Sequence, residues 1–201
     1  VSAWMQIRLG PNRVGPKGLL QSVADTVKLL VKEGMTPDGA DKFLFNLAPY
    51  IAMMVAMLLL APITFAKDLA IWNMNIGVLY VSAISSVSVI GILMAGWASN
   101  NKYSLMGAMR SGAQIVSYEL SAGLSVLAIV VLTGSLNLND IVTSQADGWW
   151  IFKGHIPVII AFIIFIIAVT AETNRPPFDL AETQSELTAG FHTEYSGMKF
   201  A

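Results

Sequence analysis

One short stretch of the chain carries far more acid than its apolar surroundings. Residues 171–195 read AETNRPPFDLAETQSELTAGFHTEY and follow an almost entirely apolar run, residues 155–171. The stretch holds one cation, Arg175, and five acids: Glu172, Asp179, Glu182, Glu186 and Glu194. Carboxylates that are crowded together raise one another's pKa and titrate as a group. Such a cluster suits a device that takes up protons and hands them on.

The same stretch also allows a purely structural interpretation. Asp179 and Glu182 fit the N-cap residue and the capping-box acid of a helix that begins after Pro176 and Pro177. Glu186 lies one turn further along, on the face of Glu182. Helix capping explains the first two acids but leaves the negative charge of the whole stretch unexplained, so both interpretations stay open.

Glu119 is a second acid in an unexpected place, because it lies seven residues into an apolar run from Gly112 to Thr133. A carboxylate in hydrocarbon costs roughly 2.5–3.5 kcal/mol, so such residues usually face a protein interior or a water path. Small residues on its helical face, Gly112 and Ala122 among them, let another helix approach. Glu119 is either the structural partner of a Lys or Arg on another helix or a proton carrier, and we favour the carrier.

The composition restricts the class of protein. Hydrophobic residues make up 55% of the chain and charged residues 12%, whereas soluble domains are nearer a quarter charged. The chain has no cysteine, two separated histidines and no dinucleotide or phosphate-loop motif. We therefore expect a membrane protein that holds no metal and no redox centre of its own. A net charge of −1 gives no reason to expect nucleic acid as a partner.

Four apolar stretches are long enough, or nearly so, to cross a bilayer: residues 43–65, 76–97, 112–133 and 155–171. Ten of the twelve Lys and Arg residues fall in one set of connections, which the positive-inside rule places in the cytoplasm. The acidic stretch belongs to that set. The sequence predicts an all-α polytopic transmembrane helix bundle with a structured acidic cytoplasmic loop at residues 172–197.

Residues 19–33 have a helical period but are too polar to span. Leu20, Val23 and Val27 share one face, while Asp25 and Lys28 lie on another. We expect an amphipathic interfacial helix on the membrane surface. Alternatively, the helix walls a lipophilic cavity entered from the bilayer, in which case Asp25 faces protein.

Three segments together resemble the signature segments of one family. They read RLGPNRVGPKGLLQSVADTVKLLVKE from Arg8, GWASNNKYSLMGAMRSGAQIVSYE from Gly96 and AETNRPPFDLAETQSELTAGFHTEYSGMKF from Ala171. Over residues 4–200 the chain is similar to the H-type membrane subunit of respiratory complex I, the proton-pumping NADH:quinone oxidoreductase, in its bacterial form. The resemblance implies that residues 1–201 are a partial single membrane domain, a fragment lacking both ends.

The resemblance also implies a function. Such a protein forms part of the quinone-binding chamber and of the path that couples quinone reduction to proton translocation in the bacterial inner membrane. It implies other membrane-arm and peripheral-arm subunits as partners, with FMN and iron–sulfur clusters in the partner subunits and quinone as substrate. The residues that match chamber or path positions are Asp25, Glu119, Arg175, Asp179, Glu182, Glu186 and Glu194. Gln184 departs from the family, which usually has an acid there.

Two rival interpretations remain. One is the homologous membrane subunit of an energy-converting hydrogenase or an F420- or ferredoxin-linked complex, but the intact AETNRPPFD segment favours the quinone enzyme. The other is a passive membrane anchor, which would gain nothing from the buried acid Glu119.

Overall fold

A computed structural model describes residues 2–66, 69–175, 177–178 and 190–199 of the chain. The chain divides into two compact units, residues 38–193 and residues 1–37 with 194–201. The larger unit holds the long apolar helices, and the smaller one holds the amphipathic helix.

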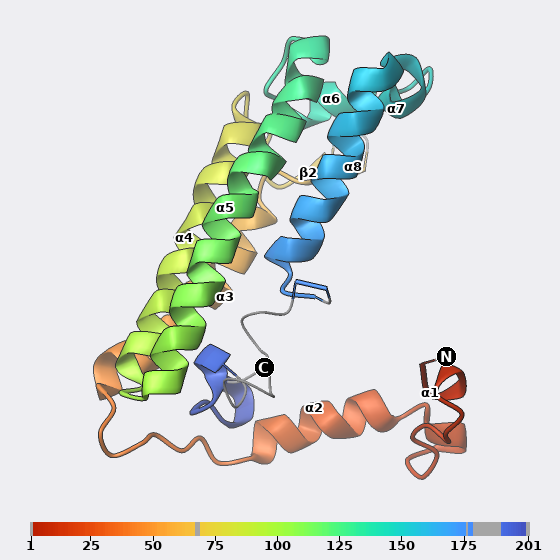
Figure 1. Cartoon of the computed structure of the whole chain (residues 1–201). Helices are drawn as coiled ribbons and strands as arrows, with labels where there is room; N and C mark the ends of the chain where they lie inside the picture. Colours follow the sequence, from red (N-terminus) through yellow and green to blue (C-terminus); the bar gives the residue numbers. More distant parts are fainter. Residues whose placement is uncertain (1, 67–68, 176, 179–189, 200–201) are drawn as a thin grey trace. The chain divides into compact units, whose positions relative to one another are not determined.

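The larger unit is a bundle of four main helices: α3 (Lys42–Leu59), α4 (Gly77–Ala98), α5 (Lys102–Thr133) and α8 (His155–Glu172). α5 packs against both α4 and α8, and α4 also packs against α3 (Figure 1). α3, α4 and α5 are long and apolar enough to cross a membrane, and α8 contains a shorter apolar stretch, Ile156–Glu172. The predicted all-α membrane bundle is therefore confirmed.

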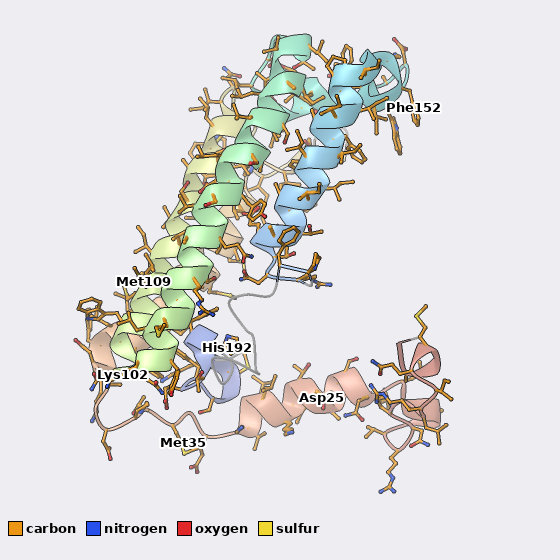
Figure 2. All side chains as sticks on the ribbon, in the orientation of Figure 1. Asp25, Met35, Lys102, Met109, Phe152 and His192 are labelled. Atoms are coloured by element: carbon orange, nitrogen blue, oxygen red, sulfur yellow. The ribbon has the colours of Figure 1, made fainter. Side chains whose placement is uncertain are left out.

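Short elements complete this unit. A two-stranded antiparallel ribbon of β1 (Thr64–Ala66) and β2 (Leu69–Ala70) follows α3, so α3 ends before the predicted limit at Phe65. α6 (Leu138–Thr143) and α7 (Trp150–Lys153) lie between α5 and α8 in the sequence, and the 3₁₀ turn η2 (Gly190–His192) follows α8. Lys102 and His192 lie at one end of the bundle and Phe152 at the other (Figure 2).

α5 is longer than its apolar run because local signals set its ends. The side chain of Asn101 accepts a hydrogen bond from the backbone N–H of Tyr103 and caps the helix. Gly134, with φ of 69°, ends it in the left-handed conformation that glycine tolerates best. At 1.5 Å per residue the helix is about 48 Å long, so it extends beyond a hydrocarbon core of about 30 Å. The polar residues 102–111 are therefore helical as well, before the predicted span at Gly112.

Small residues allow very close packing at the Lys102 end of α5. A Cβ atom added to Gly96 would lie 2.9 Å from the Ser104 carbonyl oxygen, and one added to Gly107 would lie 2.8 Å from the Gly190 Cα. The hydroxyl of Ser104 donates to the Phe191 carbonyl at 2.8 Å. Residues 190–192, which lie within the acidic stretch, are thus held against α5.

The smaller unit contains α1 (Ser2–Met5), η1 (Pro16–Gly18), α2 (Gln21–Val31) and η3 (Gly197–Lys199). α2 packs against η3, and the backbone N–H of Met35 donates to the Ser196 hydroxyl at 3.0 Å. The apolar residues Val23, Val27 and Leu30 of α2 are all more than half exposed. The amphipathic helix predicted over residues 19–33 thus forms over a shorter range, with its apolar face available to a membrane or to protein.

Candidate functional site

Glu119 lies where α5 faces α4, and its partners there are hydroxyl groups. The hydroxyl of Ser85 lies 3.0 Å from Glu119 Oε1, and that of Ser86 also donates to the same oxygen. Both serines belong to α4, and Glu119 is half-buried between the helices. α4 therefore supplies two donors to a single carboxylate oxygen on its neighbour.

Glu172 brings a third helix to the same place. It is the last residue of α8 and is half-buried. Its carboxylate lies close enough to that of Glu119 for the two charges to repel each other. Glu172 of α8 and Glu119 of α5 therefore bring acids of two neighbouring helices near each other.

The immediate surroundings of Glu119 bear on its two interpretations. Within the described residues, no Lys or Arg side chain forms an ion pair with Glu119; its hydrogen-bond donors are Ser85 and Ser86. A structural ion pair therefore has no support from the described part of the chain. Hydroxyls, unlike ammonium or guanidinium groups, can serve a carboxyl group in both its charged and its neutral form, because they both donate and accept.

Gln114 connects this region of α5 to the start of the acidic stretch. Its side-chain amide nitrogen lies 2.7 Å from the Ala171 carbonyl, 2.9 Å from the Phe178 carbonyl and 3.1 Å from Asn174 Oδ1. Asn174 has a left-handed backbone, with φ of 49°, where the chain leaves α8. The Gln114 side chain is 8% exposed, and its own oxygen is buried with no partner among the described residues. Gln114 thus fixes residues 171–178 onto α5.

Aromatic packing reinforces this attachment. The rings of Tyr118 and Phe178 meet edge to face with centroids 5.2 Å apart. Tyr118 precedes Glu119 directly, so α5 contacts the start of the acidic stretch beside the candidate acid. Arg175, the one cation predicted for the site, has an exposed side chain, while its backbone N–H donates to the Thr170 carbonyl.

The remaining predicted site residues fall elsewhere. Asp179, Glu182 and Glu186 lie outside the described residues. Asp25 and Glu194 belong to the smaller unit. There Asp25 is exposed and accepts a hydrogen bond from the Gln21 side chain at 2.9 Å.

Asp25 also lines a cavity of about 390 Å³ within the smaller unit. Lys28 and Lys32 of α2 line the same cavity, and so do Tyr195 and Ser196 from the end of the chain. Burial raises the pKa of Tyr195 from an ordinary 10.0 to about 12, so its phenol stays neutral to a higher pH than that of an exposed tyrosine. The cavity therefore combines two cations and an acid with neutral hydroxyl groups.

The sequence patterns do not mark four residues of this geometry as members of a site: Glu172, Ser85, Ser86 and Gln114. The signal that could identify Glu172 is its position at the end of an apolar helix. Ser85 and Ser86 carried no usable signal, because serines in apolar helices commonly bond to their own helix backbone.

Comparison with known proteins decides the family. A family model described as NADH dehydrogenase matches residues 1–201. The chain belongs to the NADH dehydrogenase family. The family indicated by the three signature segments is thereby confirmed.

Similar members of the NADH dehydrogenase family include curated proteins named as the H subunit of NADH-quinone oxidoreductase. Those of Bacteroides thetaiotaomicron and Phocaeicola vulgatus are each 58% identical over 200 residues, covering 100% of this chain and 56% of their own length. The protein of Brevibacillus brevis is 54% identical over 201 residues, covering 100% of this chain and 59% of its own. The chain thus spans a little over half the length of these relatives.

Proposed function

We propose that this chain is part of the H-type membrane subunit of a proton-translocating NADH:quinone oxidoreductase. In this role it forms part of the quinone-binding chamber and of the path that couples quinone reduction to proton movement. The observation that carries the proposal is the placement of Glu119, a carboxylate inside an apolar bundle, held by two hydroxyls of α4 and facing the carboxylate of Glu172. Relatives that bear the H-subunit name and are 58% identical over the chain support the same conclusion.

The coupling follows from charge balance. Reduction of a quinone to a quinol takes up two electrons and two protons, so each turnover withdraws protons from groups near the head group. We assign that supply to the acidic stretch, whose predicted members are Arg175, Asp179, Glu182, Glu186 and Glu194. Glu172 opens this stretch and repels Glu119. A change of charge in the stretch is therefore felt at Glu119, which responds by binding or releasing a proton.

Gln114 and Tyr118 make this transfer mechanical as well as electrostatic. They hold Ala171 and Phe178 against the part of α5 that comes just before Glu119 in the sequence. A displacement of the acidic stretch on quinone binding would act directly on the helix that carries Glu119. Rigid packing of this kind transmits small shifts because packed interfaces do not deform continuously.

The wider setting belongs to the same proposal. Electrons would come from FMN and iron–sulfur clusters held by partner subunits of the peripheral arm, since this chain has no cysteine. The chain would lie in the bacterial inner membrane among other membrane-arm subunits, with quinone and lipid as its small-molecule partners. The acidic stretch would face the cytoplasm, as the Lys and Arg distribution predicts. In the smaller unit, Asp25 would border the entrance to the chamber. The names of the relatives favour this enzyme over an energy-converting hydrogenase.

The proposal is tested by Glu119→Gln in the full-length protein within the assembled complex. Glutamine keeps the size of the side chain and still accepts hydrogen bonds from Ser85 and Ser86, but it cannot ionise. We expect normal assembly and normal NADH oxidation by an artificial acceptor at the peripheral arm, with quinone-dependent oxidation sharply reduced. Poor assembly would instead indicate that Glu119 is a structural ion-pair partner, because the loss of one member leaves a buried charge unpaired.

A further inference from the structure

Two serines of α4, Ser85 and Ser86, share acceptors between Glu119 and the backbone carbonyl of a third serine, Ser82. The hydroxyl of Ser85 lies 2.9 Å from the Ser82 carbonyl oxygen and 3.0 Å from Glu119 Oε1. The hydroxyl of Ser86 lies 3.0 Å from the same carbonyl and also reaches Glu119 Oε1. Each hydroxyl therefore stands between a backbone acceptor of its own helix and the carboxyl group of the neighbouring helix.

A serine hydroxyl has a single hydrogen, so it can donate to only one of these acceptors at a time. When it donates to the Ser82 carbonyl, its oxygen is free to accept a hydrogen bond from Glu119. The Ser82 carbonyl also accepts the regular helical bond from the backbone N–H of Ser86. That carbonyl stays satisfied when the hydroxyls turn away from it, so neither arrangement leaves it without a donor.

We infer that Ser85 and Ser86 form a hydroxyl switch that serves Glu119 in both of its protonation states, an inference that rests on the proposed proton-carrying role of Glu119. While Glu119 is ionised, both hydroxyls donate to Oε1, and such charge-assisted bonds are the stronger kind. When Glu119 binds a proton, one of the two hydroxyls rotates toward the free lone pair of the Ser82 carbonyl and its oxygen accepts the carboxyl O–H, while the other hydroxyl still donates to the carboxyl group. Only hydrogen atoms move, so the packing of α4 against α5 is unchanged.

The surroundings of Glu119 on its other side hold a second acid. Glu172 at the end of α8 lies near enough for its charge to interact with that of Glu119. Among the described residues, the hydroxyls of Ser85 and Ser86 are the groups that donate hydrogen bonds to Glu119. The serines are positioning residues, because they act on the proton through Glu119.

The experiment uses the assembled complex with both serines replaced, Ser85→Ala together with Ser86→Ala. Loss of two donors to a charged acceptor is expected to lower the quinone-dependent rate roughly tenfold or more, while acceptor-dependent NADH oxidation is unchanged. Each single variant keeps one donor and should lose less. Ser82→Ala is the matched control, because the Ser82 hydroxyl donates to the Val78 carbonyl of its own helix and does not touch Glu119.

An infrared difference spectrum provides a readout that a packing defect would not move. The C=O stretch of protonated Glu119, assigned by its disappearance in Glu119→Gln, should shift to higher frequency when the hydrogen bonds between its carboxyl group and the serines are lost. In the Glu119→Gln background the serine replacements should cause no further loss of quinone-dependent rate. If the double alanine variant fails to assemble, both serines are replaced by threonine in one variant and by valine in another, because threonine and valine have nearly the same shape. Only threonine keeps the hydroxyl, so only the threonine variant should keep the activity.

The outcomes separate the switch from the proposed function. A double alanine variant with a normal quinone-dependent rate and an unmoved carboxyl band, beside an inactive Glu119→Gln, would overturn the switch and leave the proposed function standing. Equal activity of the threonine and valine pairs would overturn it in the same way. A Glu119→Gln variant that translocates protons normally would overturn the proposed function, and the switch with it.

Discussion

Replacing Gln114 by Leu is expected to loosen the backbone that leads into the acidic stretch without removing any titratable group. The variant keeps a side chain of similar size at a position that is 8% exposed. It removes the donor that serves the Ala171 and Phe178 carbonyls. The Ala171 carbonyl keeps a second donor, the backbone N–H of Asn174 at 3.2 Å. The main cost therefore falls on the Phe178 carbonyl.

An unsatisfied buried carbonyl costs about 1–3 kcal/mol, which corresponds to roughly 5- to 150-fold more frequent local opening. Hydrogen exchange at residues 171–178 of the assembled complex measures that opening. The quinone-dependent rate should fall together with protection, while acceptor-dependent NADH oxidation stays normal. Ser117→Ala is the control, because within the described part of the chain the Ser117 hydroxyl bonds to the Ala113 carbonyl of its own helix. Unchanged protection in Gln114→Leu, or an equal loss in Ser117→Ala, would refute the assigned role of Gln114.

Three further substitutions test other parts of the structure. Glu172→Gln removes the charge that links the acidic stretch to Glu119, so the quinone-dependent rate should fall with assembly intact; a normal rate would show that the link is not used. Burial raises the pKa of Tyr195 to about 12 from an ordinary 10.0. As the pH rises, the unfolded chain therefore loses the phenol proton before the folded chain does. The free energy of unfolding should accordingly fall as the pH rises from 10 toward 12. The tyrosinate absorbance of wild type minus Tyr195→Phe should accordingly show a midpoint near 12, and a midpoint near 10 would contradict the burial. Gly107→Val places a side chain 2.8 Å from the backbone of Gly190, which should cost about 1–3 kcal/mol and lower the yield of assembled complex; Gly123→Ala, with open space around it, should assemble normally.

The helices could be predicted because their apolar runs are long, but their ends depended on local contacts. The hydropathy pattern predicts that the third membrane span begins at Gly112, whereas the helix begins at Lys102. The polar residues in between remain helical because Asn101 caps the first turn and because small residues pack this part closely against its neighbours. Similarly, α3 ends at Leu59, and after a short turn the chain pairs as a β ribbon from Thr64. A hydropathy scale contains no information on helix capping or on strand pairing.

The candidate site could be predicted only as far as charge reveals it. Glu119 was recognisable because a carboxylate inside an apolar run has a large desolvation cost. Its serine donors could not be recognised, because serines in a helix commonly bond to their own backbone, as Ser85 also does. Only the packing of α4 against α5 shows that Ser85 and Ser86 point toward Glu119. Gln114 gave no sign for the same reason: its acceptors lie more than fifty residues further along the chain.

The central claim is that Glu119 carries a proton whose movement is coupled to quinone reduction. The most direct test is the number of protons moved across the membrane per NADH oxidised, measured in vesicles that contain the assembled complex with Glu119→Gln, Glu119→Asp or the wild-type residue. We expect fewer protons per NADH in the residual turnover of Glu119→Gln, with Glu119→Asp between that variant and wild type because it titrates but is one methylene shorter. A wild-type proton number at a wild-type quinone rate in Glu119→Gln would contradict the claim.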